Sequence, residues 1–97
     1  MPNFTLRGGN TRPEVPASTT AGAMVLSENP GRVDLVIYNP GAVAIVIAFG
    51  TAIGTGITIA ATSYLPQMQH VPTDQIFARS TGAAGTLQIL EVLRVPG

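Results

Sequence analysis

Residues 32–49 read RVDLVIYNPGAVAIVIAF, two apolar stretches on either side of an Asn-Pro-Gly tripeptide. The first stretch has an apolar and a polar face, because Val33, Leu35 and Ile37 alternate with Arg32, Asp34 and Tyr38. This alternation predicts a β-strand with one buried face. The second stretch, 42–49, is apolar or small on both faces. It predicts a central strand that is covered on both sides.

The Asn-Pro-Gly tripeptide occurs at residues 29–31 and again at 39–41. Proline presets φ for a turn, glycine accepts a positive φ, and the asparagine side chain can bond to the backbone that follows. Turns that recur at this spacing are typical of a β-meander or a β-sandwich.

Five further segments have the composition of strands, namely 1–6, 23–27, 57–59, 76–80 and 86–95. In the last of them the apolar phase changes between Ile89 and Leu90, which predicts a β-bulge. Residues 7–13 predict turn and coil, and Pro66 makes 64–70 a loop or an edge strand. We therefore predict an all-β fold, a small antiparallel β-sandwich or barrel of about six to seven strands, with no helix.

Residues 1–22 differ in composition from the rest of the chain. They are rich in Pro, Ser, Thr and Gly, and cannot bury enough apolar area to fold alone. We predict an extended N-terminal arm at 1–22 and a β-sandwich domain at 23–97. The arm is either a frayed tail or a segment that lies on a neighbouring subunit. Because the first ten residues lack the basic region and apolar run of a secretory signal, no Sec export is expected.

Charged residues are sparse and unevenly placed. They make up 10% of the chain, against about a quarter in an average domain. The 39 residues from 35 to 73 contain no Asp, Glu, Lys or Arg. Five Arg balance five acidic residues and lysine is absent, so the chain offers no basic groove for nucleic acid. Arginine without lysine suits a protein whose surfaces are covered by other proteins.

The uncharged segment 42–61 has the length of a membrane-spanning helix. Gly50 and Gly54 give it the GxxxG spacing of paired membrane helices. Against this interpretation, the segment has no Leu, several Gly and Thr residues and the alternation of strands. These features favour a β-core, and the membrane helix remains as an alternative.

No residue pattern in the chain predicts catalysis. The absence of Cys excludes disulfides, and the single histidine, His70, is too little for a zinc site of ordinary composition. The carboxylates are isolated, the serines lack a Gly-x-Ser-x-Gly context, and the glycines fit neither a dinucleotide fingerprint nor a P-loop. We therefore predict no catalytic residue, no metal site and no cofactor, and a protein that is not an enzyme.

Four segments carry a resemblance to a known class of proteins: RVDLVIYNPG at 32–41, VAIVIAFG at 43–50, IFARS at 76–80 and LQILE at 87–91. Together they resemble the small structural proteins of tailed bacteriophages, the capsid decoration (cement) proteins and head-fibre proteins. The resemblance implies an adhesive protein without catalytic residues. Such a protein clamps neighbouring capsid subunits, commonly as a trimer, with a β-rich body and extended arms.

The expected function is that of a virion structural protein, assembled in the host cytoplasm, which decorates or cements the capsid as a homo-oligomer. Its expected partner is the major capsid protein or another virion protein, with no nucleic acid and no membrane. The candidate interface residues are Phe4, Leu6, Tyr64 and His70. One alternative is a head-fibre or tail adhesion or receptor-binding module, for which Tyr64 is the available loop aromatic. The other is a small holin-like membrane protein that spans the bilayer with 42–61.

Overall fold

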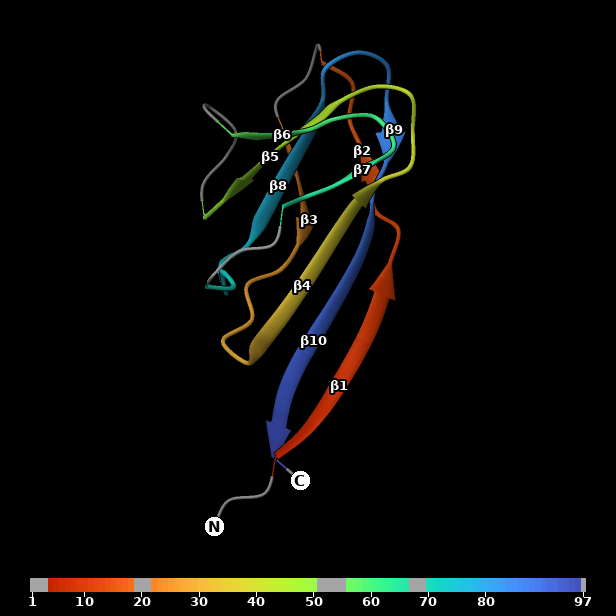
Figure 1. Cartoon of the computed structure of the whole chain (residues 1–97). Coiled ribbons are helices and arrows are strands. Elements are labelled where there is room, and N and C mark those ends of the chain that lie inside the picture. Colours follow the sequence, from red (N-terminus) through yellow and green to blue (C-terminus); the bar gives the residue numbers. More distant parts are fainter. Residues whose placement is uncertain (1–3, 19–21, 51–55, 67–69, 97) are drawn as a thin grey trace.

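The computed structural model describes residues 4–18, 22–50, 56–66 and 70–96, with the backbone alone for residues 4, 5, 95 and 96 (Figure 1). These residues form ten β-strands and no helix: β1 (Phe4–Thr11), β2 (Glu14–Val15), β3 (Ala23–Leu26), β4 (Arg32–Asn39), β5 (Ile45–Phe49), β6 (Ile57–Ile59), β7 (Ser63–Tyr64), β8 (Ile76–Ser80), β9 (Gly85–Thr86) and β10 (Gln88–Pro96). Each strand pair is antiparallel.

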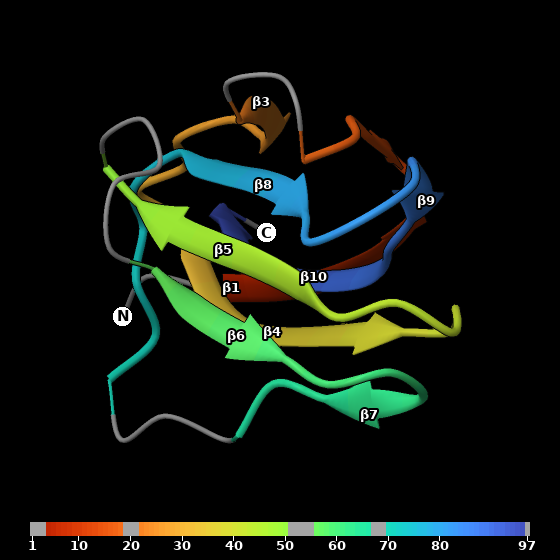
Figure 2. The same ribbon diagram turned by 90° about the horizontal axis from the view of Figure 1, so that it is seen from above.

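Two four-stranded sheets form the body of the molecule. The first sheet has the order β1-β10-β4-β7, the second has the order β3-β8-β5-β6, and β2 pairs with β9 separately. Figure 2 shows the second sheet lying across the first, with β2 and β9 to one side. The all-β antiparallel sandwich that the sequence predicts is therefore confirmed.

The core lies between the sheets and consists of aliphatic side chains. Its members are at most 2% exposed: Val15, Ile37, Ile45, Ile47, Ile59, Ile76, Ala78, Leu87 and Ile89. Most of these are β-branched residues, which pack well on a pleated surface. Because each fully buried Ile or Leu contributes about 1.5–3 kcal/mol relative to an exposed one, this cluster is the main driving force for the fold.

The strands of three or more residues overlap the seven predicted segments, although β1 does so only at residues 4–6, and the additional strands β2, β7 and β9 have two residues each. β5 lies between β8 and β6, as predicted for an inner strand, although it begins at Ile45 rather than at residue 42. Because β5 and β6 lie within 42–61, the membrane-helix alternative for that segment is wrong, and the strands that the sequence favours there are found. In the described ranges no helix is long and apolar enough to cross a membrane.

Both Asn-Pro-Gly tripeptides make the same side-chain hydrogen bond. The Gly31 backbone N–H donates to Asn29 Oδ1 at 2.9 Å, and the Gly41 N–H donates to Asn39 Oδ1 at 3.1 Å. The predicted turn chemistry, in which the asparagine holds the backbone two residues on, is confirmed at both places.

A bulge in β4 places a charged residue inside the sandwich. The register between β10 and β4 shifts between Val92 and Leu93, which leaves Val33 without a partner. A shift of one residue turns the following side chain to the opposite face. Arg32, which the sequence predicts on the polar face, is therefore 3% exposed. The bulge predicted between Ile89 and Leu90 is wrong, because the register is continuous there.

The buried Arg32 guanidinium has a partner for each of its nitrogen atoms. Nε donates to Glu91 Oε2 at 2.7 Å. Nη1 donates to the carbonyl oxygens of Pro72 at 2.7 Å and Asp74 at 3.0 Å, and Nη2 donates to Ser27 O at 2.7 Å. Arg32 thus ties β4 to β10 and to the segments before β4 and β8.

The N-terminal segment follows the C-terminal segment of the same chain. β1 pairs with β10 from Phe4–Pro96 to Thr11–Ile89, so the turn and coil predicted for 7–13 is wrong for residues 7–11. The contact between the two segments continues beyond β1. The Leu87 N–H donates to Pro13 O at 3.1 Å, β2 pairs with β9, and the Ser80 N–H donates to Pro16 O at 2.9 Å. Whether residues 1–22 act as a separate arm on a neighbouring subunit stays a prediction.

The far halves of β1 and β10 extend beyond the sandwich as a two-stranded ribbon (Figure 1). This ribbon makes the molecule elongated, with extents of 50 × 24 × 22 Å. The sandwich body and the ribbon share the first sheet, so one continuous sheet face runs from the tip of the ribbon to β7.

Candidate interaction face

The buried polar side chains of the described chain serve the fold. Asn39 is fully buried, and its Nδ2 donates to the carbonyl oxygens of Val43 at 2.8 Å and of Ile59 and Ala60 at 3.2 Å. Ser80 Oγ accepts the Gly82 N–H at 3.1 Å. Among the described residues no group of three or more His, Asp or Glu side chains is placed to hold a metal ion. The candidate functional groups therefore lie on the surface.

The outer face of the first sheet carries a row of large polar and aromatic side chains. Directly paired residues of antiparallel strands point to the same side of a sheet. Tyr64 pairs with Tyr38, and Tyr38 pairs with Gln88. Arg12 follows Thr11, which pairs with Ile89, so Arg12 continues the row beyond Gln88. We call these four residues the tyrosine row.

The rows that follow on the same face contain both apolar and polar side chains. Val36, Leu90 and Asn10 form the second row, Asp34, Val92 and Gly8 the third, and Arg94 and Leu6 the fourth. Leu6, Tyr64 and Val36 are 65%, 64% and 38% exposed. The exposed apolar side chains on this face thus extend from β7 to the ribbon.

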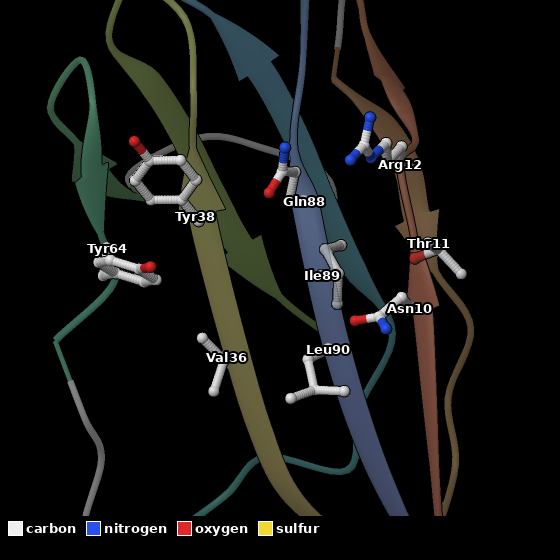
Figure 3. A pocket seen from close by; sticks show the side chains of 9 residues that line it. All are labelled: Asn10, Thr11, Arg12, Val36, Tyr38, Tyr64, Gln88, Ile89 and Leu90. Carbon is white, nitrogen blue, oxygen red and sulfur yellow. The ribbon is translucent and has the colours of Figure 1, made fainter.

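A hollow of about 340 Å³ lies over the tyrosine row (Figure 3). It is lined by Asn10, Thr11, Arg12, Val36, Tyr38, Tyr64, Gln88, Ile89 and Leu90. The Tyr38 and Tyr64 rings border it with their centroids 4.5 Å apart and their planes tilted by 40°. Tilted ring pairs at this separation are stabilising, so each ring holds the other in place.

The structure places the four predicted interface residues in different surroundings. Leu6 and Tyr64 lie on the same sheet face, but at its opposite ends. Phe4 begins β1, and its side chain is outside the described residues. His70 is exposed in the connection between β7 and β8 and belongs to no strand. Their role at an interface stays a prediction.

The sequence interpretation missed Arg12, Gln88 and Asn10 as members of this face. Tyr38 could be found, because the alternation in 32–38 places it with Asp34 on the polar side. The other three become neighbours of Tyr38 only through the pairing of β10 with β1 and β4. Nothing in the local sequence shows this pairing.

No protein-family model matches the sequence, and no curated protein matches it. Among solved structures, the fold is similar to that of a chain from Bacillus endospore appendages, which form a family of disulfide-linked pili. The TM-score is 0.55 at 21% sequence identity, and the similarity covers 97% of this chain and 90% of that chain. At this identity the likeness concerns the fold, which is a small β domain of nearly the same extent.

Proposed function

We propose that this protein is a non-enzymatic structural protein that works by associating with other protein subunits. The observation that carries the proposal is the free edge of β1. This strand of eight residues ends the first sheet, so one of its sides has no neighbouring strand among the described residues. The edge runs along the ribbon, where it is accessible to another chain.

The free edge of β1 carries few of the features by which proteins usually block edge strands. Unpaired backbone groups on an edge strand can pair with a strand from another chain. Proteins usually prevent this with charged side chains such as Lys, with Pro, with bulges or with short edge strands. Residues 4–11 contain one charge, on Arg7, and neither Lys nor Pro. The β1–β10 register has no shift. An open edge of this kind supports association by strand addition.

The surface of the molecule has the size and character for such a contact. A compact monomer of 10.0 kDa exposes about 5,200 Å², whereas this chain exposes 5845 Å². The excess of roughly 600 Å² approaches the ~800 Å² that each partner contributes to a standard interface. Leu6 supplies an exposed apolar group beside the free edge.

Two kinds of assembly fit this role. The phage resemblance of 32–92 supports a virion protein that cements major capsid subunits as a homo-oligomer, with a trimer favoured. The fold likeness to a Bacillus endospore appendage chain supports a subunit that assembles with its own copies into an appendage. Because this sequence contains no cysteine, copies of it would associate without disulfides.

The first experiment measures the mass of the purified protein by light scattering over a range of concentrations. We expect a multiple of the 10.0 kDa chain mass for the unaltered protein. Leu6→Lys should reduce the mass to that of a single chain, because a lysine on an edge strand opposes strand addition. Met24→Lys is the matched control, since Met24 is 53% exposed on β3, an edge strand of the second sheet.

Two further measurements distinguish the assemblies. Co-sedimentation with phage heads that lack this protein tests the capsid role, and electron microscopy of the protein alone tests for filaments. A point substitution is preferable to deletion of the N-terminal segment, because deletion would expose β10 as a new edge. A protein of single-chain mass that neither binds heads nor forms filaments would contradict the proposal.

A further inference from the structure

We propose that the hollow over the tyrosine row binds an oligosaccharide that carries a carboxylate. The hollow combines an aromatic platform, amide side chains and one cation with apolar side chains in its lining. Its volume of about 340 Å³ is within the range of small-molecule sites, which are roughly 300–1,000 Å³. The site lies at the β7 end of the sheet face, although Asn10 and Thr11 of its lining belong to β1, the strand with the free edge.

The aromatic platform is Tyr64, whose ring is exposed and braced. The side chain is 64% exposed, and Tyr38 supports its ring at a centroid distance of 4.5 Å. A sugar ring has an apolar face of C–H groups, which packs against an aromatic ring, and an edge of hydroxyl groups. Tyrosine suits both, because its ring is apolar and its hydroxyl can form hydrogen bonds.

The polar groups around the hollow are free to bind the sugar hydroxyls. In the described part of the chain, no hydrogen bond or ion pair uses the side chain of Asn10, Arg12 or Gln88, or a hydroxyl of Tyr38 or Tyr64. Each amide offers both donors and an acceptor, as a hydroxyl group requires. Figure 3 shows Gln88 between Tyr38 and Arg12, with Asn10 one row below.

The charge of the hollow selects an acidic sugar. Arg12 is the charged residue of the lining, and none of the lining residues is a carboxylate. A guanidinium presents paired N–H groups that match the two oxygens of a carboxylate. The row from Tyr64 to Arg12 spans three strand spacings, about 14 Å. This length exceeds one sugar ring, so we infer an oligosaccharide with its acidic unit at Arg12.

A larger hollow elsewhere lacks these groups. It has a volume of about 540 Å³ and lies beside β2 and β9, where small residues such as Ala23, Ala84 and Gly85 line it. Its charged residue is Glu14, which would repel an acidic sugar. Neither aromatic rings nor amide side chains occur in its lining. The hollow over the tyrosine row is therefore the better carbohydrate site.

The test uses the full chain on an array of oligosaccharides that contain uronic or sialic acids, with their neutral counterparts. The expected result is binding of acidic members in preference to the neutral ones. The best-bound oligosaccharide is then titrated by calorimetry against the unaltered protein and its variants. An array on which no acidic oligosaccharide is bound would overturn the proposal.

Three variants identify the site. Tyr64→Ala should weaken binding at least tenfold, and Arg12→Gln should weaken binding of the acidic oligosaccharide at least tenfold and remove the preference over the neutral one. Met24→Ala, on the second sheet, should bind as the unaltered protein does. Equal affinity of Tyr64→Ala and the unaltered protein would overturn the site. A change of mass in solution on Tyr64→Ala, with no change in sugar binding, would instead make the hollow a contact between copies.

Discussion

Two buried polar residues, Arg32 and Asn39, stand at the two ends of β4 and fix the segments around it. Each donates to carbonyl oxygens of both a nearby and a distant segment of the chain, Ser27 and Asp74 for Arg32, and Val43 and Ala60 for Asn39. In the described chain no buried side-chain N or O atom lacks a hydrogen bond. Losing either residue would leave several carbonyl oxygens without a hydrogen-bond donor. Each unpaired buried polar group costs about 1–3 kcal/mol.

At the residue scale, Arg32→Met should lower the free energy of unfolding by about 3–5 kcal/mol. The substitution leaves Glu91 and the carbonyl oxygens of Pro72, Asp74 and Ser27 without their donor. Glu91→Gln keeps an acceptor for Nε but removes the carboxylate charge beside the buried guanidinium, so it should cost less than Arg32→Met, about 1.5–3 kcal/mol. Urea unfolding measures both. Losses below about 1 kcal/mol for Arg32→Met would contradict this role.

The position of Arg32 shows what local sequence can and cannot predict. The alternation in 32–38 places Val33 inside and Arg32 outside, which holds only while the strand keeps its register. The bulge at Val33 reverses the order, and it depends on the pairing with β10. By contrast, the Asn29 and Asn39 turns were predictable, because their hydrogen bonds reach only two residues along the chain.

At the element scale, the strands follow local composition and their pairing does not. Strand segments such as 76–80 were predicted because alternation and β-branched residues are local signals. Residues 7–11, with the sequence RGGNT, indicate a turn, yet they form a strand because β10 pairs with them. Tertiary pairing outweighs such local preferences. The hollow over the tyrosine row was unpredictable for the same reason, since its residues come together only through the pairing of four strands, β1, β4, β7 and β10.

The element-scale prediction concerns two glycines in different settings. A Cβ on Gly56, just before β6, would collide with Ile47 O and lie 2.7 Å from Val46 Cγ1. A Cβ on Gly9, in β1, would meet nothing within 4 Å. Gly56→Ala should therefore destabilise the protein by about 1–3 kcal/mol. Gly9→Ala should change stability by no more than about 0.5 kcal/mol, or raise it slightly.

Chemical denaturation of the two alanine variants, side by side, measures this difference. Gly9→Ala controls for the effect of alanine on the unfolded chain. Equal midpoints for the two variants would show that β6 does not pack against β5 as closely as the backbone positions indicate.

At the scale of the whole molecule, the decisive feature is the ribbon that leaves the sandwich. The body holds the buried aliphatic cluster, whereas the ribbon presents a free edge and Leu6 to the solvent. Domains of this size have small stability margins, and a ribbon outside the core gains from association. The elongated shape of 50 × 24 × 22 Å therefore agrees with a subunit that is completed by a neighbour.

If association stabilises the fold, the melting temperature should depend on protein concentration. Anything that binds the folded chain alone stabilises it by mass action. For a domain of this size, a tenfold rise in concentration should raise Tm by roughly 3–6 °C. Differential scanning calorimetry measures the shift. Leu6→Lys should melt at a temperature that is independent of concentration, and a constant Tm for the unaltered protein would speak against coupled assembly.

The pairing of Phe4 with Pro96 has a mechanical consequence. Both ends of the described chain leave from the same tip, and the hydrogen bonds of an antiparallel pair run perpendicular to the strands. A force that pulls the two ends apart would therefore open the bonds one after another, as a zipper opens, beginning at the tip. The same force applied between Leu6 and Tyr64 would act along the strands and strain many bonds at once. The protein should thus resist tension along its length better than tension between its ends.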